Sequence, residues 1–156
     1  MQSDKASQSP GKLLIADDSA EMRRLLRRLC AHAFADIREC ADGEQAVAAF
    51  TEQRPDCVLM DIAMPLQDGL SATARIVAHE PAARIIIISQ HDDAPFREAA
   101  ARAGAIGFVS KHDLNPLRRL LGLASATIGS PRRDAAAISG SVTSQKNKDQ
   151  STKPAP

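Results

Sequence analysis

Short apolar runs recur between residues 11 and 123, and the stretches that separate them have the apolar spacing of helices. Strands are expected at residues 12–17, 36–40, 56–61, 84–89 and 105–111. All except the second carry continuous apolar runs, as in parallel strands that helices cover on both faces. Residues 36–40 instead alternate apolar and polar side chains, which is typical of a strand at the edge of a sheet.

The intervening stretches predict helices. Apolar residues from Met22 to Ala33 recur at spacings of three and four, with arginines on the opposite side. Asp18 and Glu21 have the form of a capping box, so Asp18 is expected to be the N-cap of the first helix. Further helices are expected at residues 43–50, 70–79, 94–103 and 113–121. Five successive strand–helix units predict an α/β domain with one open parallel sheet and helices on both faces.

The two ends of the chain differ from this body in composition. Residues 1–10 are polar, and residues 124–156 are rich in Ser, Ala, Gly, Thr, Lys and Pro. Such segments bury too little apolar area to offset chain entropy, so both ends are expected to be disordered. The predicted organisation is a single domain at residues 11–123 between a disordered N-terminus and a disordered polar tail.

Composition argues against several classes of function. A formal net charge of +1 gives no electrostatic case for nucleic acid or an anionic membrane as a direct partner. The chain has four phenylalanines and no tyrosine or tryptophan, which argues against base stacking. It has no apolar run of membrane-spanning length and no apolar signal peptide, so a cytoplasmic protein is expected. Cys30, Cys40 and Cys57 match no zinc spacing and are expected to be buried, reduced thiols.

Strong polar residues stand at the same end of four predicted strands. Asp17 and Asp18 close the first, Asp61 the third, Ser89 the fourth and Lys111 the fifth. A carboxylate is costly to bury at the end of an apolar strand, so these positions require an explanation. In open α/β sheets, ligands bind beyond the carboxyl ends of the strands. The five side chains are therefore expected to form one site if their strands lie side by side.

Three carboxylates in one place repel one another, by roughly 1 kcal/mol for a pair 4 Å apart in water and about 4 kcal/mol at an effective dielectric constant of 20. Raised pKa values or a bound cation would compensate, and oxygen ligands of this kind suit Mg²⁺. A metal ion, the Lys111 ammonium group and the Ser89 hydroxyl group together can hold a phosphoryl group. One carboxylate would then be the nucleophile that attacks phosphorus to give an acyl phosphate.

This set of residues, with the stretch DIAMPLQDG that begins at Asp61, resembles the receiver domain of two-component response regulators over about residues 11–123. The segments VLMDIAMPLQDGLSATARI and SQHDDAPFREAAARAGAIGFVSK are most similar to receivers that precede a helix-turn-helix output domain. The resemblance implies a single flavodoxin-like domain with strand order 2-1-3-4-5. Because no output domain follows in the sequence, a stand-alone receiver is expected.

The resemblance also assigns roles to the acidic residues. Asp61 would be the phosphoacceptor, taking a phosphoryl group from a phosphohistidine on a sensor kinase or a phosphotransfer protein. Asp18 would bind Mg²⁺ directly and Asp17 largely through water, while Asp61 and the backbone carbonyl of Ala63 would complete the metal site. Transfer and the later loss of the phosphoryl group would be self-catalysed, so the protein would be an enzyme only in this limited sense.

The same resemblance implies that Ser89 and Lys111 bind phosphoryl oxygens, and that Ser89 and Phe108 form a phosphorylation switch. The fourth helix, fifth strand and fifth helix would carry the signal to a protein partner or form a homodimer. The side chains expected on that face are Phe96, Arg97, Ala101, Lys111, Leu117 and Arg118. His112 stands where many receivers have a proline after the lysine, often joined by a cis bond, so the isomer of this peptide stays open.

Three other classes of protein are alternatives to a stand-alone receiver. The first is a DNA-binding transcription regulator that lacks its output domain. The second is a phosphatase of the haloacid-dehalogenase type, which also uses an aspartate nucleophile but carries a second aspartate two residues later, where Ala63 stands here. The third is a flavodoxin-like cofactor-binding protein, although the chain lacks a Ser/Thr-rich phosphate loop after the first strand.

Overall fold

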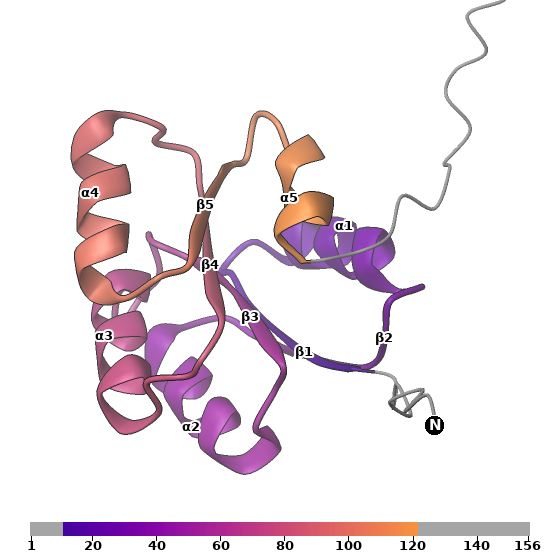
Figure 1. Cartoon of the computed structure of the whole chain (residues 1–156). Coiled ribbons are helices and arrows are strands. Elements are labelled where there is room, and N and C mark those ends of the chain that lie inside the picture. The colour runs from indigo at the N-terminus through magenta and orange to yellow at the C-terminus, as the bar shows by residue number, and fades with distance from the viewer. Residues whose placement is uncertain (1–10, 122–156) are drawn as a thin grey trace, which may run out of the picture. The chain divides into compact units, whose positions relative to one another are not determined.

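The structure is a computed structural model, and it describes residues 11–121 (Figure 1). Its five strands form one parallel sheet in the order β2-β1-β3-β4-β5. The strands are β1 (Gly11–Ala16), β2 (Phe34–Cys40), β3 (Cys57–Asp61), β4 (Ile85–Ser89) and β5 (Gly107–Ser110). The helices are α1 (Ala20–Cys30), α2 (Gly43–Gln53), α3 (Gly69–His79), α4 (Ala94–Ala103) and α5 (Asn115–Leu120).

This architecture confirms the predicted flavodoxin-like α/β fold and its strand order. The alternating segment forms the edge strand β2, as predicted, and the other four segments form strands that lie next to one another. The disordered ends predicted at residues 1–10 and 124–156 lie outside the described residues. No helix among residues 11–121 is long and apolar enough to cross a membrane.

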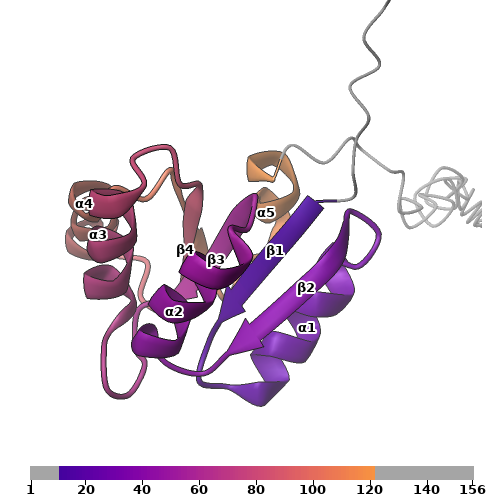
Figure 2. The same ribbon diagram turned by 90° about the horizontal axis from the view of Figure 1, so that it is seen from below.

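Helices cover both faces of the sheet. Helices α1 and α5 pack on one face, and α2, α3 and α4 pack on the other (Figures 1 and 2). Successive side chains of a strand point to opposite faces, so a continuously apolar strand serves both layers. In β4, for example, Ile85 and Ile87 belong to the same core cluster as Ile76 of α3, while Ile86 and Ile88 belong to the cluster that contains Leu26 of α1. Burial on both sides is therefore the reason for the apolar runs in the sequence.

The first helix begins one residue later than the capping pattern predicted. Ser19, and not Asp18, is the N-cap of α1, and its hydroxyl oxygen accepts a hydrogen bond from the Met22 backbone N–H at 3.3 Å. The Asp18 side chain is exposed and takes no part in the cap. The prediction that Asp18 caps the helix was therefore wrong, and its carboxylate is available to the site described below.

One further expectation needs correction. The fifth helix is shorter than the predicted 113–121, because Asp113 stays outside it and accepts a hydrogen bond from the Asn115 backbone N–H at 3.0 Å. The loop between β3 and α3 has one residue in the left-handed conformation, Leu66, with φ of 66°, and Gly69 is the first residue of α3. The backbone of Gly69 lies so close to Asp61 that an added Cβ would fall 1.7 Å from the Asp61 carbonyl oxygen.

The three cysteines are buried and form no disulfide, in agreement with their predicted role. Burial raises the pKa of each thiol to about 11. A thiol with such a pKa is almost entirely protonated at neutral pH and is a poor nucleophile or metal ligand. The cysteines therefore act as small apolar side chains in the core.

Candidate functional site

The carboxylates of Asp17, Asp18 and Asp61 meet at the carboxyl edge of the sheet. Oxygen atoms of all three lie within 4.8 Å of one another. Strand pairing explains this, because β1 and β3 are parallel neighbours in which Ala16 is opposite Met60. The next residue of each strand is an aspartate, so Asp17 and Asp61 stand side by side. Both are buried, with 1% and 4% of their surface exposed, whereas Asp18 is exposed.

Lys111 joins the two buried carboxylates. Its ammonium nitrogen lies 2.8 Å from Asp17 Oδ2 and 3.2 Å from Asp61 Oδ2. The residue follows β5, and its backbone N–H donates a 2.7 Å hydrogen bond to the carbonyl oxygen of Ser89. There is no cis peptide bond in the described part of the chain, so the Lys111–His112 peptide is trans. The lysine therefore reaches the site from a strand that is not adjacent to β1 or β3.

The charged groups of the cluster shift one another's pKa values. Burial raises the pKa of Asp61 from its ordinary 3.8 to about 6, the Asp17 charge adds to the increase, and Lys111 opposes it. Burial alone would lower the pKa of Lys111, but its hydrogen bond to Asp17 and the charge of Asp61 outweigh burial and raise it. One ammonium group faces three carboxylates, and the unbalanced negative charge favours a bound cation.

The three carboxylates fit a magnesium site. Their oxygen atoms are hard ligands, and Mg²⁺ binds proteins through one or two carboxylates while it retains several waters. Ala63, whose carbonyl oxygen is the further predicted ligand, lies in the loop two residues beyond Asp61. The assignment of these four residues as metal ligands stays a prediction, and the acidic cluster is compatible with it.

Hydrogen bonds fix the loop that carries the two adjacent aspartates. Asp17 Oδ1 accepts a bond from the Ser19 backbone N–H at 2.8 Å, and the Asp17 N–H donates to the Cys40 carbonyl at 3.1 Å. The Arg23 guanidinium donates a 2.7 Å bond to the Asp17 carbonyl oxygen. The sequence pattern placed the arginines of this helix opposite its apolar side and did not predict this contact. Helix periodicity shows which side of a helix is polar, but not which backbone atom lies beyond it.

The two residues predicted to act as a switch lie in neighbouring strands. Ser89 ends β4 and is 2% exposed, and its hydroxyl oxygen accepts a 3.1 Å hydrogen bond from the His91 backbone N–H. Phe108 is half-buried in β5, and the guanidinium carbon of Arg97 lies 4.8 Å from the centre of its ring. Their roles in phosphoryl binding and switching stay predictions.

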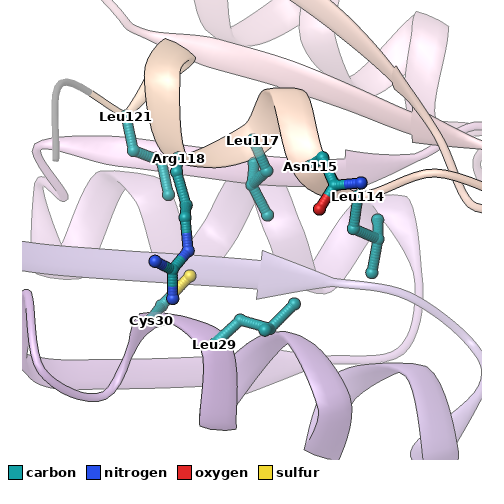
Figure 3. Close-up of a pocket in the computed structure, with 7 residues that line it drawn as sticks. All are labelled: Leu29, Cys30, Leu114, Asn115, Leu117, Arg118 and Leu121. Carbon is teal, nitrogen blue, oxygen red and sulfur yellow. The ribbon is translucent and has the colours of Figure 1, made fainter. Parts of the chain in front are cut away.

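The prediction of which side chains lie on the signalling face of α4, β5 and α5 is wrong in part. Leu117 is buried, and it lines a pocket between α1 and α5 together with Leu29, Cys30 and Arg118 (Figure 3). Leu117 and Arg118 therefore face α1. The groove over β5, between α4 and α5, is lined by Asp92, Arg97, Phe108, Val109, Ser110, Asp113, Pro116, Arg119 and Leu120. The error arose because the apolar pattern of α5 does not show whether a side chain faces α1 or the groove between α4 and α5.

The strand order and the acidic cluster at the carboxyl edge define an α/β protein of the flavodoxin-like receiver class. The model of the response regulator receiver domain family matches residues 13–121, so the chain belongs to this family. It is thus the receiver domain of a two-component response regulator, as the sequence resemblance predicted.

Relatives support this assignment. Chemotaxis protein CheY of Halobacterium salinarum is 37% identical over 100 residues, covering 64% of this chain and 83% of that protein. A LuxR-family two-component response regulator from Aurantimonas sp. SI85-9A1 has a similar structure, with a TM-score of 0.66, 33% identity and coverage of 72% and 81%. CheY of Borrelia burgdorferi, solved in a complex with CheX, BeF3 and Mg²⁺, gives a TM-score of 0.64, 30% identity and coverage of 76% and 90%.

The pKa of Asp61 predicts how the stability of the metal-free protein depends on pH. The folded-state pKa of about 6 exceeds the ordinary 3.8, so folding strengthens proton binding at Asp61 between these values. The contribution of Asp61 to stability should therefore fall as pH rises from about 4 to 6, and by pH 7 the charge opposes folding by at most about 3 kcal/mol. Asp61→Asn should exceed wild type in stability at pH 7.5 and match it at pH 4, as measured by urea unfolding with EDTA. The same gain at both pH values would contradict this origin.

Proposed function

We propose that this receiver accepts a phosphoryl group on Asp61 from a phosphohistidine of a sensor kinase or phosphotransfer protein. The observation that carries the proposal is the contact of Lys111, whose side chain is 8% exposed, with both Asp17 and Asp61 at the carboxyl edge of the sheet. An ammonium group that already lies between two carboxylates is well placed to bind an incoming oxyanion. The domain would span residues 11–123 of a cytoplasmic protein.

In this proposal Asp61 is the nucleophile. One carboxylate oxygen attacks phosphorus, and an O–P bond forms while the P–N bond to the donor imidazole breaks. The electron pair of the broken bond stays on the imidazole nitrogen, which takes up a proton. Lys111 and the Ser89 hydroxyl each donate a hydrogen bond to a phosphoryl oxygen. The raised pKa of Asp61 indicates a carboxylate that is weakly solvated and therefore strongly basic for its type.

The carboxylates of Asp17, Asp18 and Asp61, with the carbonyl oxygen of Ala63, would hold Mg²⁺. When bound, the ion would neutralise negative charge on the transferred phosphoryl group. The presence of BeF3 and Mg²⁺ in the structure of Borrelia burgdorferi CheY supports this part of the proposal. The signal would leave through α4, β5 and α5, by binding a protein partner or a second copy of the chain.

The proposal is tested with a ³²P-labelled small phosphodonor, such as acetyl phosphate, or a phosphorylated kinase. Label should enter the protein in the presence of Mg²⁺ and be lost after treatment with hydroxylamine, because an acyl phosphate is labile to that nucleophile. EDTA should reduce labelling by at least about tenfold, since the unbalanced carboxylates then repel the oxyanion. Labelling that is unaffected by EDTA, or that survives hydroxylamine, would reject the proposed chemistry.

A further inference from the structure

A continuous series of contacts runs from Ser89 through the β4–α4 loop to α4. The Ser89 hydroxyl oxygen accepts the His91 backbone N–H at 3.1 Å. The His91 ring stacks on the ring of Phe96, with centres 4.9 Å apart and planes inclined by 16°. The next loop residue, Asp92, forms an ion pair with Arg97 and also accepts a 3.4 Å hydrogen bond from Arg97 Nε at its carbonyl oxygen. Two successive loop residues thus hold two successive residues of the first turns of α4.

The series continues to Phe108. The guanidinium carbon of Arg97 lies 4.8 Å from the centre of the Phe108 ring, within the range of a cation–π interaction. Arg97 and Phe108 both line the groove between α4 and α5, together with Asp92. The side chains of Arg97 and Asp92 are 49% and 46% exposed, so their ion pair is within reach of solvent and of a partner.

We infer that Arg97 is a latch that holds the ring of Phe108 in its half-buried position, and that Asp92 holds the latch in place. The inference rests on the proposed function, because it specifies how the switch of this site is regulated. When the Ser89 hydroxyl group turns toward a phosphoryl group, the loop that carries Asp92 loses its hydrogen bond at His91. A shift of that loop separates Asp92 from Arg97, and the ring is then free to move inward.

The strength of such a latch is modest. A partly exposed cation–π contact and an exposed ion pair are each weak, and together they shift an equilibrium by several-fold to about tenfold. Interactions of this strength shift a two-state equilibrium but leave both states populated. Phosphorylation can therefore overcome the latch, while loss of the latch should populate the active arrangement in unphosphorylated protein.

The test follows Phe108 by ¹⁹F NMR in protein labelled with fluorophenylalanine, with the Phe108 resonance assigned from a Phe108→Leu sample. The variants are Arg97→Met, which removes the charge but keeps a long side chain, and Asp92→Asn, which removes the ion pair alone. Arg102→Met is the matched control, since Arg102 is also an exposed arginine of α4 but pairs with Glu98 of the same helix. Beryllofluoride with Mg²⁺ serves as the phosphoryl mimic.

Without beryllofluoride, the Phe108 resonance of Arg97→Met should already shift toward its beryllofluoride-saturated position, and Asp92→Asn should shift it in the same direction by less. The beryllofluoride concentration at half-saturation should fall several-fold in Arg97→Met and stay unchanged in Arg102→Met. A Phe108 resonance in Arg97→Met that matches wild type would overturn the latch. An unchanged resonance in Asp92→Asn would overturn the part assigned to Asp92.

The failure of the latch and the failure of the proposed function can be told apart. The resonance of Phe108 without beryllofluoride reports on the latch alone. Phosphodonor labelling of the same variants reports on Asp61, and it should be retained in Arg97→Met because Arg97 lies outside the acidic cluster. Labelled protein with an unmoved resonance contradicts only the latch, whereas absence of label in wild type contradicts the proposed function.

Discussion

Replacing Asp61 by asparagine is expected to reduce covalent labelling by a phosphodonor roughly a thousandfold or more, to the background of the assay. The change keeps the shape of the side chain but removes the only carboxylate oxygens proposed to attack phosphorus, and removing a nucleophile usually has an effect of this size. Labelling with ³²P in the presence of Mg²⁺ measures the result. Asp61 is the right target because it is buried beside Lys111, which would hold the transferred group.

A matched control separates loss of the nucleophile from loss of one acidic residue. Asp36→Asn removes an exposed carboxylate from the edge strand β2, away from the acidic cluster, and should label like wild type. Failure to fold is not expected to explain the loss of label, because removal of the buried Asp61 charge should stabilise the protein at neutral pH. Full labelling of folded Asp61→Asn would show that another residue accepts the phosphoryl group.

Replacing Gly69 by alanine should destabilise the protein by roughly 3 kcal/mol or more. A Cβ at this position would lie 1.7 Å from the carbonyl oxygen of Asp61, 2.7 Å from its carbonyl carbon and 2.9 Å from Cγ of Met60. Two of the three atoms belong to the backbone of Asp61, so relief requires α3 and β3 to move apart. Urea unfolding at pH 7 should show the loss as a lower midpoint.

Gly107→Ala is the control for the general effect of adding a methyl group. The nearest atoms to a Cβ there are the ends of the Leu120 side chain, at 3.0 and 3.3 Å, and a flexible side chain can give way. Its stability should change by less than about 1 kcal/mol, because alanine also restricts the unfolded chain. If both variants lose the same stability, the close approach of α3 to Asp61 is not the reason for glycine at position 69.

The strands were predictable because the local sequence of each one is sufficient to indicate a strand. A strand between two helical layers must be apolar at every position, and the run of isoleucines at 85–88 meets that demand without help from its neighbours. The ends of helices were less predictable. Asp18 and Ser19 are both good N-caps, and which of them caps α1 depends on the backbone path of the loop after β1. The side that each α5 residue faces was not predictable either, because it depends on the position of α1.

The sequence by itself determined the class of fold, the edge position of β2 and the acidic and basic residues at the carboxyl ends of the strands. These are local properties, since an apolar run and the charge that ends it lie within a few residues of each other. Only the tertiary structure decided that Lys111 lies between Asp17 and Asp61, that Arg23 holds the Asp17 backbone and that Arg97 covers Phe108. Each of these contacts depends on the direction of a long side chain relative to another element, and strand pairing and helix packing set that direction.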